Sequence, residues 1–109
     1  MATESLLVLT TCGPSEADRI ASTLVERRLA ACVNTVSGVV SAYRWKGKVE
    51  REQESLLIIK TTSDRYPALE EAIRETSSYE LPEVVAVRMA GGSPAYLDWV
   101  AGAVGQDSE

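Results

Sequence analysis

Two long β-prone runs joined by one tight turn constrain the fold of this chain more than any other feature of its sequence. The first run extends from about Cys32 to Trp45 and the second from about Lys48 to Thr61, with Lys46 and Gly47 between them. A glycine in a short connection between two β-prone runs predicts a β-hairpin. Each arm is about twice the usual strand length of 5–6 residues, so we expect the hairpin to project beyond its parent sheet.

The second arm changes character midway, and this change indicates where the parent sheet ends. Its second half is an apolar block, whereas its first half carries Glu50, Arg51, Glu52 and Glu54. We expect the charged half to lie outside the core of the subunit. A projecting hairpin with exposed apolar residues is an aggregation hazard unless another subunit covers it. The pattern therefore predicts a symmetric oligomer with interlocked hairpins.

The remaining residues predict two more strands and three helices. Apolar runs at residues 6–11 and 84–87 predict the strands. The order βαββαβ plus a terminal helix predicts an α+β fold of the ferredoxin-like, split βαβ type, with two helices on one face of a four-stranded antiparallel sheet. The third helix and neighbouring subunits are expected to cover the other face.

Polar residues mark where each helix begins. The sequence predicts an N-cap at Ser15 for the first helix, at Ser63 or Asp64 for the second and at Ser93 for the third. Glu16 follows the first of these caps, where a carboxylate interacts favourably with the helix dipole, worth some tenths of a kcal/mol. No larger role is predicted for Glu16 from the sequence.

Composition excludes several classes of function. The 109 residues fit one domain, which we predict to span residues 1–109. The chain has no histidine, which removes Ser-His-Asp and Cys-His catalysis and His-based zinc sites. A net charge of −5 disfavours nucleic acid as a partner. With no long apolar run and no secretory signal, the sequence predicts a cytoplasmic protein without a membrane partner.

The candidate chemical groups are cysteines, carboxylates and aromatic rings. Cys12 lies between a strand and the start of a helix, and without a histidine to activate its thiol it is expected to be a small turn residue. Cys32 follows a helix and is expected to pack as a small apolar residue. Glu80 and Glu83 flank Leu81 and Pro82, a rigid spacing that can direct two carboxylates at one cation. A thiolate such as that of Cys32 would shift the preference toward copper or zinc. The aromatic side chains are expected to anchor subunits or to line a ligand pocket; they are Tyr43, Trp45, Tyr79, Tyr96 and Trp99.

Several ordered motifs of this chain resemble the CutA divalent-cation tolerance family. The similarity is collinear from about Leu6 to Trp99. Its motifs are Leu29-Ala30-Ala31-Cys32-Val33-Asn34, Ser41-x-Tyr43-x-Trp45-x-Gly47-Lys48, Glu54 to Ile59 followed by Lys60-Thr61-Thr62, Tyr79-Glu80-x-Pro82-Glu83 and Tyr96-Leu97-x-Trp99.

The resemblance implies a PII-like homotrimer that shares strands between subunits and binds a divalent metal ion or small ligand at the subunit interface. It implies a role in the response to metal ions such as copper, no enzymatic activity and no required cofactor, with copper or zinc as the possible cation. The intersubunit cleft would include Tyr43, Trp45, Lys60, Thr61, Tyr79 and Trp99, supported by Glu83, and the metal ligands would be Glu80, Glu83 and Cys32.

The chain departs from the family pattern before Tyr79. Many members carry His-Pro where this chain has Ser77 and Ser78, so the histidine implicated as a copper ligand is missing. Loss of a neutral imidazole is expected to weaken copper binding. An alternative hypothesis is a PII-like signalling protein that binds a small anionic metabolite at the intersubunit cleft through Lys60. An acylphosphatase-like enzyme is disfavoured because the first loop, residues 10–14, contains no Arg or Lys.

Overall fold

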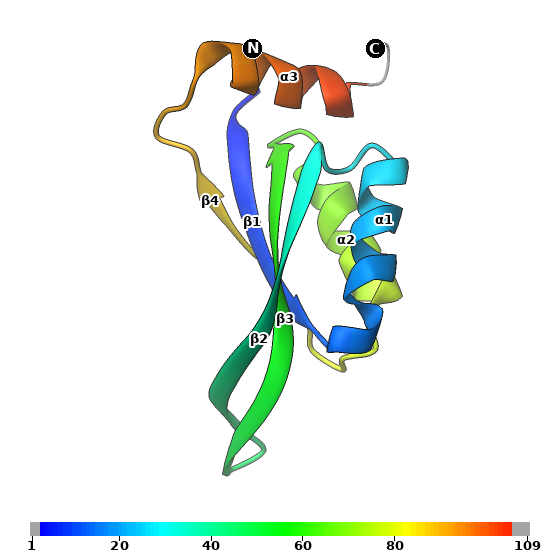
Figure 1. The fold of residues 1–109 in the computed structure, drawn as a ribbon, viewed down its shortest axis with the longest axis vertical. Coiled ribbons are helices and arrows are strands. Elements are labelled where there is room, and N and C mark those ends of the chain that lie inside the picture. Colours follow the sequence, from blue (N-terminus) through cyan, green and yellow to red (C-terminus); the bar gives the residue numbers. More distant parts are fainter. Residues whose placement is uncertain (1–2, 106–109) are drawn as a thin grey trace.

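The computed structural model describes residues 3–105 and contains four strands, three α-helices and one short 3₁₀ helix (Figure 1). The predicted domain of residues 1–109 also includes residues 1–2 and 106–109, which lie outside the described residues. In chain order the elements are β1 (Ser5–Cys12), η1 (Pro14–Glu16), α1 (Ala17–Glu26), β2 (Cys32–Trp45), β3 (Lys48–Thr62), α2 (Tyr66–Thr76), β4 (Val85–Arg88) and α3 (Pro94–Val104).

The strands form one antiparallel sheet in the order β2-β3-β1-β4. Helices α1 and α2 lie side by side on one face of this sheet, and α3 crosses the end of the sheet where β1 begins (Figure 1). This is the predicted ferredoxin-like arrangement. None of the helices within residues 3–105 is long and apolar enough to cross a membrane.

The hairpin of β2 and β3 projects beyond the sheet, as predicted. Strand β1 pairs with β3 from residue 55 to residue 62. Residues 48–54 of β3 pair with residues 39–45 of β2 and, among the described residues, with no other strand. Lys46 and Gly47 form the turn with φ angles of 50° and 82°, a combination typical of a type I′ hairpin turn. The hairpin gives the molecule its longest dimension, 45 Å (Figure 1).

A β-bulge bends the hairpin where it leaves the sheet. The register between β2 and β3 shifts between Val36 and Val39, and Gly38 lies in the shift with a φ of 73°. Glycine adopts this left-handed conformation without the steric cost that a Cβ atom imposes. The bulge predicted at Gly38 is therefore confirmed.

The main core lies between the sheet and the first two helices. Strand β1 alternates, with the helix-facing residues buried and the others half-buried. Val8, Leu24, Ile59 and Leu69 are fully buried in this core. Val100 and Val104 of α3 are also buried, but they lie outside this main cluster. The core therefore fixes α1 and α2 against one face of the sheet.

The opposite face of the sheet leaves apolar side chains exposed. Partners in antiparallel strands place their side chains on the same face, and the half-buried Leu7 and Leu9 of β1 pair with Val87 and Val85 of β4. Val85 and Val87 are 50% and 51% exposed. We call this surface, with Leu56 and Ile58 of β3, the open sheet face. It is the face that the sequence predicts to be covered by the third helix and other subunits, and within one chain α3 crosses the end of the sheet (Figure 1).

Three details of the sequence-based prediction were wrong. Ser15 lies inside η1, and α1 begins at Ala17 with no side-chain hydrogen bond at its N-cap. Helix α2 begins at Tyr66, and neither Ser63 nor Asp64 is its N-cap residue. Their side-chain oxygens instead accept hydrogen bonds from the Glu4 backbone N–H and the Thr62 hydroxyl. The prediction for Ser93 is confirmed, because its hydroxyl accepts the Tyr96 N–H at 3.4 Å.

The third error concerns Glu54, which was expected outside the core with the charged half of β3. Glu54 is 6% exposed, and it accepts a hydrogen bond of 2.7 Å from the hydroxyl of Tyr79. A buried carboxylate is stable only when hydrogen bonds or countercharges compensate its lost hydration. The partner lies 25 residues away in the chain, so the local sequence pattern could not show it.

Two buried threonines differ in whether the hydroxyl has a hydrogen-bond partner, and valine substitutions at the two positions should therefore change stability in opposite directions. Within the described residues, the Thr10 hydroxyl is buried without a hydrogen-bond partner, whereas the Thr61 hydroxyl donates to the Leu29 carbonyl at 2.7 Å. We expect Thr10→Val to raise the free energy of unfolding by about 1 kcal/mol and Thr61→Val to lower it by about 1 kcal/mol or more. Urea unfolding at fixed protein concentration measures both, and equal effects of the same sign would contradict this account.

Candidate functional site

A cleft of about 690 Å³ opens where the hairpin leaves the sheet. Strand β1 contributes Thr11 to its lining, and the other residues come from β2, β3 and the loop between α2 and β4. We call it the acidic cleft; its lining residues are Thr11, Ser41, Ala42, Tyr43, Trp45, Glu52, Glu54, Ser78, Tyr79, Glu80, Leu81 and Glu83. The lining contains four carboxylates and no lysine or arginine.

The loop between α2 and β4 forms one wall of the acidic cleft. Tyr79 reaches across from this loop, and its hydroxyl donates to Glu54 of β3. Glu83 accepts a long hydrogen bond of 3.5 Å from the Thr11 hydroxyl. Glu80 lies 3.7 Å from the ammonium of Lys46 at the hairpin turn. The loop is therefore connected to three different strands or turns of the sheet.

Burial and the negative charge of the cleft both raise the pKa values of its two tyrosines. Burial, the hydrogen bond to Glu54, and the charges of Glu54 and Glu52 raise the pKa of Tyr79 well above its usual range. Partial burial and the nearby Glu52, Glu54 and Glu50 also raise the pKa of Tyr43. Both phenols therefore remain protonated at neutral pH, and the Tyr79 hydroxyl can donate to the carboxylate.

Replacing Tyr79 by phenylalanine tests this contact. The change leaves the buried Glu54 carboxylate without its hydrogen-bond donor, and we expect the free energy of unfolding to fall by about 1.5–3 kcal/mol. Tyr96→Phe is the matched control, because Tyr96 is 41% exposed on α3, and its effect should stay within about 0.5 kcal/mol. Chemical denaturation of both variants decides, and equal losses would mean that the contact with Glu54 does not stabilise the fold.

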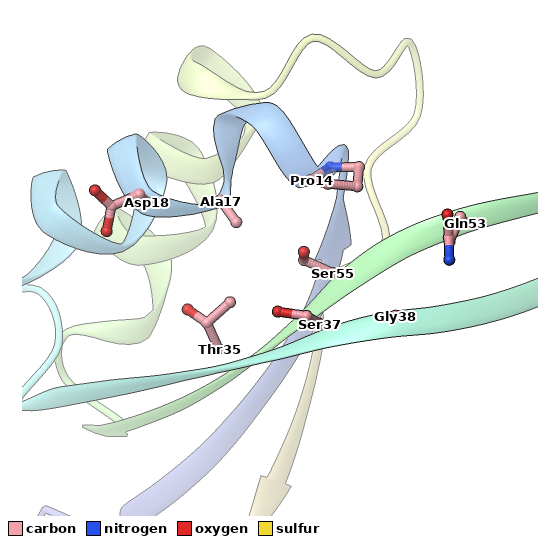
Figure 2. A pocket seen from close by; sticks show the side chains of 8 residues that line it. All are labelled: Pro14, Ala17, Asp18, Thr35, Ser37, Gly38, Gln53 and Ser55. Carbon is pink, nitrogen blue, oxygen red and sulfur yellow. The ribbon is translucent and has the colours of Figure 1, made fainter.

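A second cavity, of about 380 Å³, lies on the helix side of the hairpin, beside the start of α1 (Figure 2). Its lining is mostly small and polar: Pro14, Ala17, Asp18, Thr35, Ser37, Gly38, Gln53 and Ser55. None of the site residues predicted from the sequence lines this cavity. The acidic cleft is therefore the better candidate for the functional site.

The structure brings together five of the predicted site residues, all in the acidic cleft: Tyr43, Trp45, Tyr79, Glu80 and Glu83. Lys60 lies farther along β3, paired with Leu7 and Cys32, and its ammonium donates to Asn34. Thr61 is fully buried. Trp99 lies on α3, with its ring centroid 5.5 Å from that of Tyr96. Within one chain, Lys60, Thr61 and Trp99 are thus not part of the cleft.

The predicted metal ligands are also separated within one chain. Glu80 and Glu83 line the acidic cleft, whereas Cys32 begins β2 in the parent sheet. Across residues 3–105, no three Cys, Asp or Glu side chains are grouped so that they could hold a metal ion. Cys12 is buried, and burial together with the negative charges of Glu16 and Glu54 raises the pKa of its thiol. Within the described part of one chain, the proposed carboxylate ligands and Cys32 therefore do not meet in one site.

Sequence reasoning missed several groups that define the cleft. Glu52 and Glu54 were predicted only as part of the exposed charged half, and Thr11 only as part of a strand. The register places Glu54 opposite Val39 and Glu52 opposite Ser41, and both pairs lie on the turn side of the bulge. A residue count back from the turn at Lys46 and Gly47 is the signal that could have placed Glu52 and Glu54 opposite these residues of β2.

The four-stranded antiparallel sheet with its projecting hairpin places the chain among the small α+β proteins of the split βαβ, ferredoxin-like type. Residues 6–103 match the family described as CutA1 divalent ion tolerance protein. The chain belongs to this family.

Comparisons with known proteins agree with this assignment. The chain is 45% identical over 97 residues to the divalent-cation tolerance protein CutA of Thermus thermophilus, covering 89% of this chain and 94% of the relative. It is 49% identical to the mouse protein CutA, covering 77% of this chain but 48% of the relative. The chain thus spans about half the length of this animal relative.

Solved structures give the same answer for the fold. The CutA1 structure from Thermus thermophilus has a TM-score of 0.90 at 45% identity and covers 93% of this chain and 99% of its own. A structure described as the PII-like protein CutA from Nostoc sp. has a TM-score of 0.87 at 36% identity and covers 92% and 97%. The expected PII-like, ferredoxin-like fold is therefore confirmed.

Proposed function

We propose that this chain is a divalent-cation tolerance protein that binds a divalent cation in the acidic cleft and catalyses no reaction. The single observation that carries the proposal is the lining of the cleft, which has four carboxylates and no lysine or arginine. Carboxylate oxygens suit divalent cations, and the relatives are named for tolerance of such ions. Glu80 and Glu83 are the proposed ligands, with copper or zinc as the proposed cation.

We also propose that the cleft is completed in a homotrimer. Residues 39–54 extend past the other strands and carry Val40 at 64% and Val49 at 69% exposure. The open sheet face adds a second apolar surface. In a ring with three-fold symmetry, each subunit contacts the next through two different surfaces. Such a contact can bring Lys60, Trp99 and Cys32 of one subunit toward the cleft of the next, which would account for their separation within one chain. Thr61 is fully buried in its own subunit, so it can only support such a cleft from behind.

Isothermal titration with Cu²⁺, Zn²⁺ and Mg²⁺ tests the cation proposal. We expect saturable binding of at least one of these ions to the unmodified protein, and a loss of about tenfold or more in affinity in the double variant Glu80→Gln and Glu83→Gln. The matched control, Glu71→Gln and Glu75→Gln, removes the same charge from the exposed side of α2. Equal affinity of both double variants would remove Glu80 and Glu83 as ligands, and no saturable binding would remove the cation role.

The alternative is a PII-like signalling protein that binds a small anionic metabolite between subunits. The Nostoc relative described as PII-like favours it. Lys60 favours it as well, because this half-buried residue pairs with Leu7 beside the open sheet face and its ammonium donates to Asn34. The carboxylates of the acidic cleft repel anions, so this ligand would need a basic group from a neighbouring subunit. A thermal-shift screen of nucleotides and organic acids distinguishes the two, because a ligand that binds the folded state raises its melting temperature.

The cellular location remains a prediction. Among the relatives, the Arabidopsis thaliana and Oryza sativa proteins are named chloroplastic and the Archaeoglobus fulgidus protein periplasmic, so location varies within the family. We propose the cytoplasm for this chain, and fractionation of the source cells with an antibody against the full chain tests it.

A further inference from the structure

We infer that Glu16 is a positioning residue for the acidic cleft: it clamps the loop between α2 and β4 that carries Tyr79, Glu80 and Glu83. The part of this inference that concerns ligand affinity rests on the proposed function, whereas the part that concerns the loop stands on the geometry alone. Nothing in the sequence pattern around Glu16 indicates this role, because its main partner lies 62 residues away.

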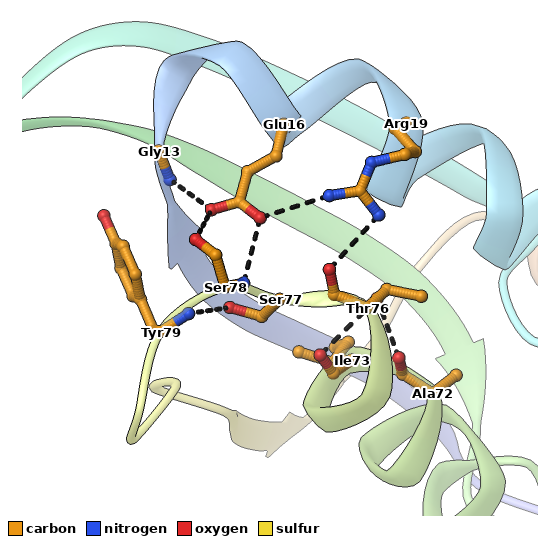
Figure 3. Close-up of polar contacts among 9 residues, drawn as sticks. All are labelled: Gly13, Glu16, Arg19, Ala72, Ile73, Thr76, Ser77, Ser78 and Tyr79. Atoms are coloured by element: carbon orange, nitrogen blue, oxygen red, sulfur yellow. Dashed lines mark hydrogen bonds and ion pairs between the residues drawn. The ribbon is translucent and has the colours of Figure 1, made fainter.

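The Glu16 carboxylate is buried and receives donors from three directions (Figure 3). The Ser78 backbone N–H donates to it at 3.0 Å and the Ser78 hydroxyl at 2.7 Å. The Gly13 N–H donates at 3.4 Å and the Arg19 guanidinium at 3.3 Å. We call these four residues the Glu16 clasp. Hydrogen bonds to a charged acceptor are stronger than neutral ones, so the clasp holds Ser78 firmly against α1.

The clasp acts next to the residue that reaches into the cleft. Tyr79 follows Ser78 directly, and its N–H donates to the Ser77 hydroxyl at 3.1 Å (Figure 3). Arg19 also donates to the Thr76 carbonyl at 3.2 Å, which fixes the start of the same loop. The Tyr79 hydroxyl then bonds Glu54 inside the cleft. A continuous set of contacts therefore runs from α1, through the loop, to the floor of the acidic cleft.

Serine at position 78 makes this arrangement possible. Its N–H and its hydroxyl both reach the carboxylate, whereas a proline at this position would offer neither donor. Ser77 and Ser78 replace the His-Pro of many family members, so the chain lacks the imidazole at position 77 but has two hydrogen-bond donors to Glu16 at position 78. The loop wall of the cleft is held by a carboxylate of the same chain.

The charge state of Glu16 gives the clasp a measurable signature. Burial alone would raise the pKa of Glu16, but the hydrogen bonds from Ser78 and Gly13 and the charge of Arg19 lower it below its usual value. Arg19 and the thiol of Cys12 are the other titratable groups that interact with it. Because the folded-state pKa is lowered, the stabilisation is complete above the usual pKa of glutamate and is lost as pH falls through the lowered pKa.

The test follows backbone amides of the full-length ¹⁵N-labelled chain by NMR between neutral and acid pH. We expect the Gly13 and Ser78 amide shifts to titrate together with one apparent pKa below the usual glutamate value, and this transition to be absent in Glu16→Gln. At pH 7 we expect amide exchange of residues 79–81 to rise about tenfold or more in Glu16→Gln. Zn²⁺ affinity, measured by calorimetry, should fall by about tenfold.

Two further variants test whether the effects of Glu16→Gln come from the loss of the Glu16 clasp. Glu26→Gln removes an exposed carboxylate from the last residue of α1 and should change none of the three readouts. Ser78→Ala keeps the carboxylate and removes one donor, so it should give smaller changes in the same direction, and it serves if Glu16→Gln does not fold.

Two results would overturn the inference. The first is an unchanged amide exchange rate of residues 79–81 in Glu16→Gln. The second applies if the unmodified protein binds Zn²⁺: a Zn²⁺ affinity of Glu16→Gln equal to that of the unmodified protein. If the unmodified protein binds no Zn²⁺, the proposed metal-ion function loses support, and the exchange of residues 79–81 alone decides whether Glu16 positions the loop.

Discussion

Replacing Leu24 by alanine is expected to lower the free energy of unfolding by about 2–5 kcal/mol, because a large side chain is removed from a closed core and the cavity does not refill. Leu24 is fully buried on the inner face of α1, among the core residues that hold this helix against the sheet. For a domain of this size, such a loss lowers the melting temperature by roughly 10 °C or more. Chemical and thermal unfolding at one fixed protein concentration measure it.

Val25→Ala is the matched control for this prediction. Val25 is the next residue of the same helix, and it is 42% exposed. Alanine has the higher helix propensity, so we expect a change within about 0.5 kcal/mol. If the two variants unfolded with similar free energies, the core between α1 and the sheet would not be the main source of stability.

Placing a carboxylate on the open sheet face is expected to dissociate the proposed trimer. Val87 is 51% exposed on β4 and pairs with Leu7. In a trimer that buries this face, Val87→Glu leaves three unpaired carboxylates in apolar interfaces, each with a cost of about 2 kcal/mol or more. We expect the variant to remain folded and to sediment as smaller species at concentrations where the unmodified protein is assembled.

Ala68→Glu provides the control for added charge. Ala68 is exposed on α2, on the opposite face of the sheet from the proposed interface, so this variant should assemble like the unmodified protein. Circular dichroism of both variants establishes that they are folded. If Val87→Glu assembled normally, the open sheet face would not be the subunit interface.

The hairpin was predictable because its signals are local. Lys46 and Gly47 mark the turn, β-prone residues fill both arms, and Gly38 marks the bulge, and each of these features lies within a few residues of the structure that it determines. The order of elements then restricts the topology to a small number of sheets.

The first residues of the helices and the lining of the clefts were less predictable, because both depend on contacts between residues far apart in the sequence. Ser15 has a side chain that is common at helix N-caps, but it lies inside η1, and α1 begins only at Ala17. The neighbouring Glu16 accepts hydrogen bonds from Ser78, a contact that the local sequence does not show. Glu54 resembles its exposed neighbours in the sequence, yet Tyr79 makes its burial possible. The aromatic and acidic residues of the candidate site were recognisable by type, whereas their grouping into one cleft depends on the bulge and on the loop.

We propose that a single subunit leaves the projecting hairpin and the open sheet face uncovered, and that three copies assemble with the acidic cleft between them. Sedimentation equilibrium of the unmodified chain at micromolar concentration tests this claim most directly. The account predicts a mass about three times the 11.8 kDa of one chain. A single species with the mass of one chain would contradict it.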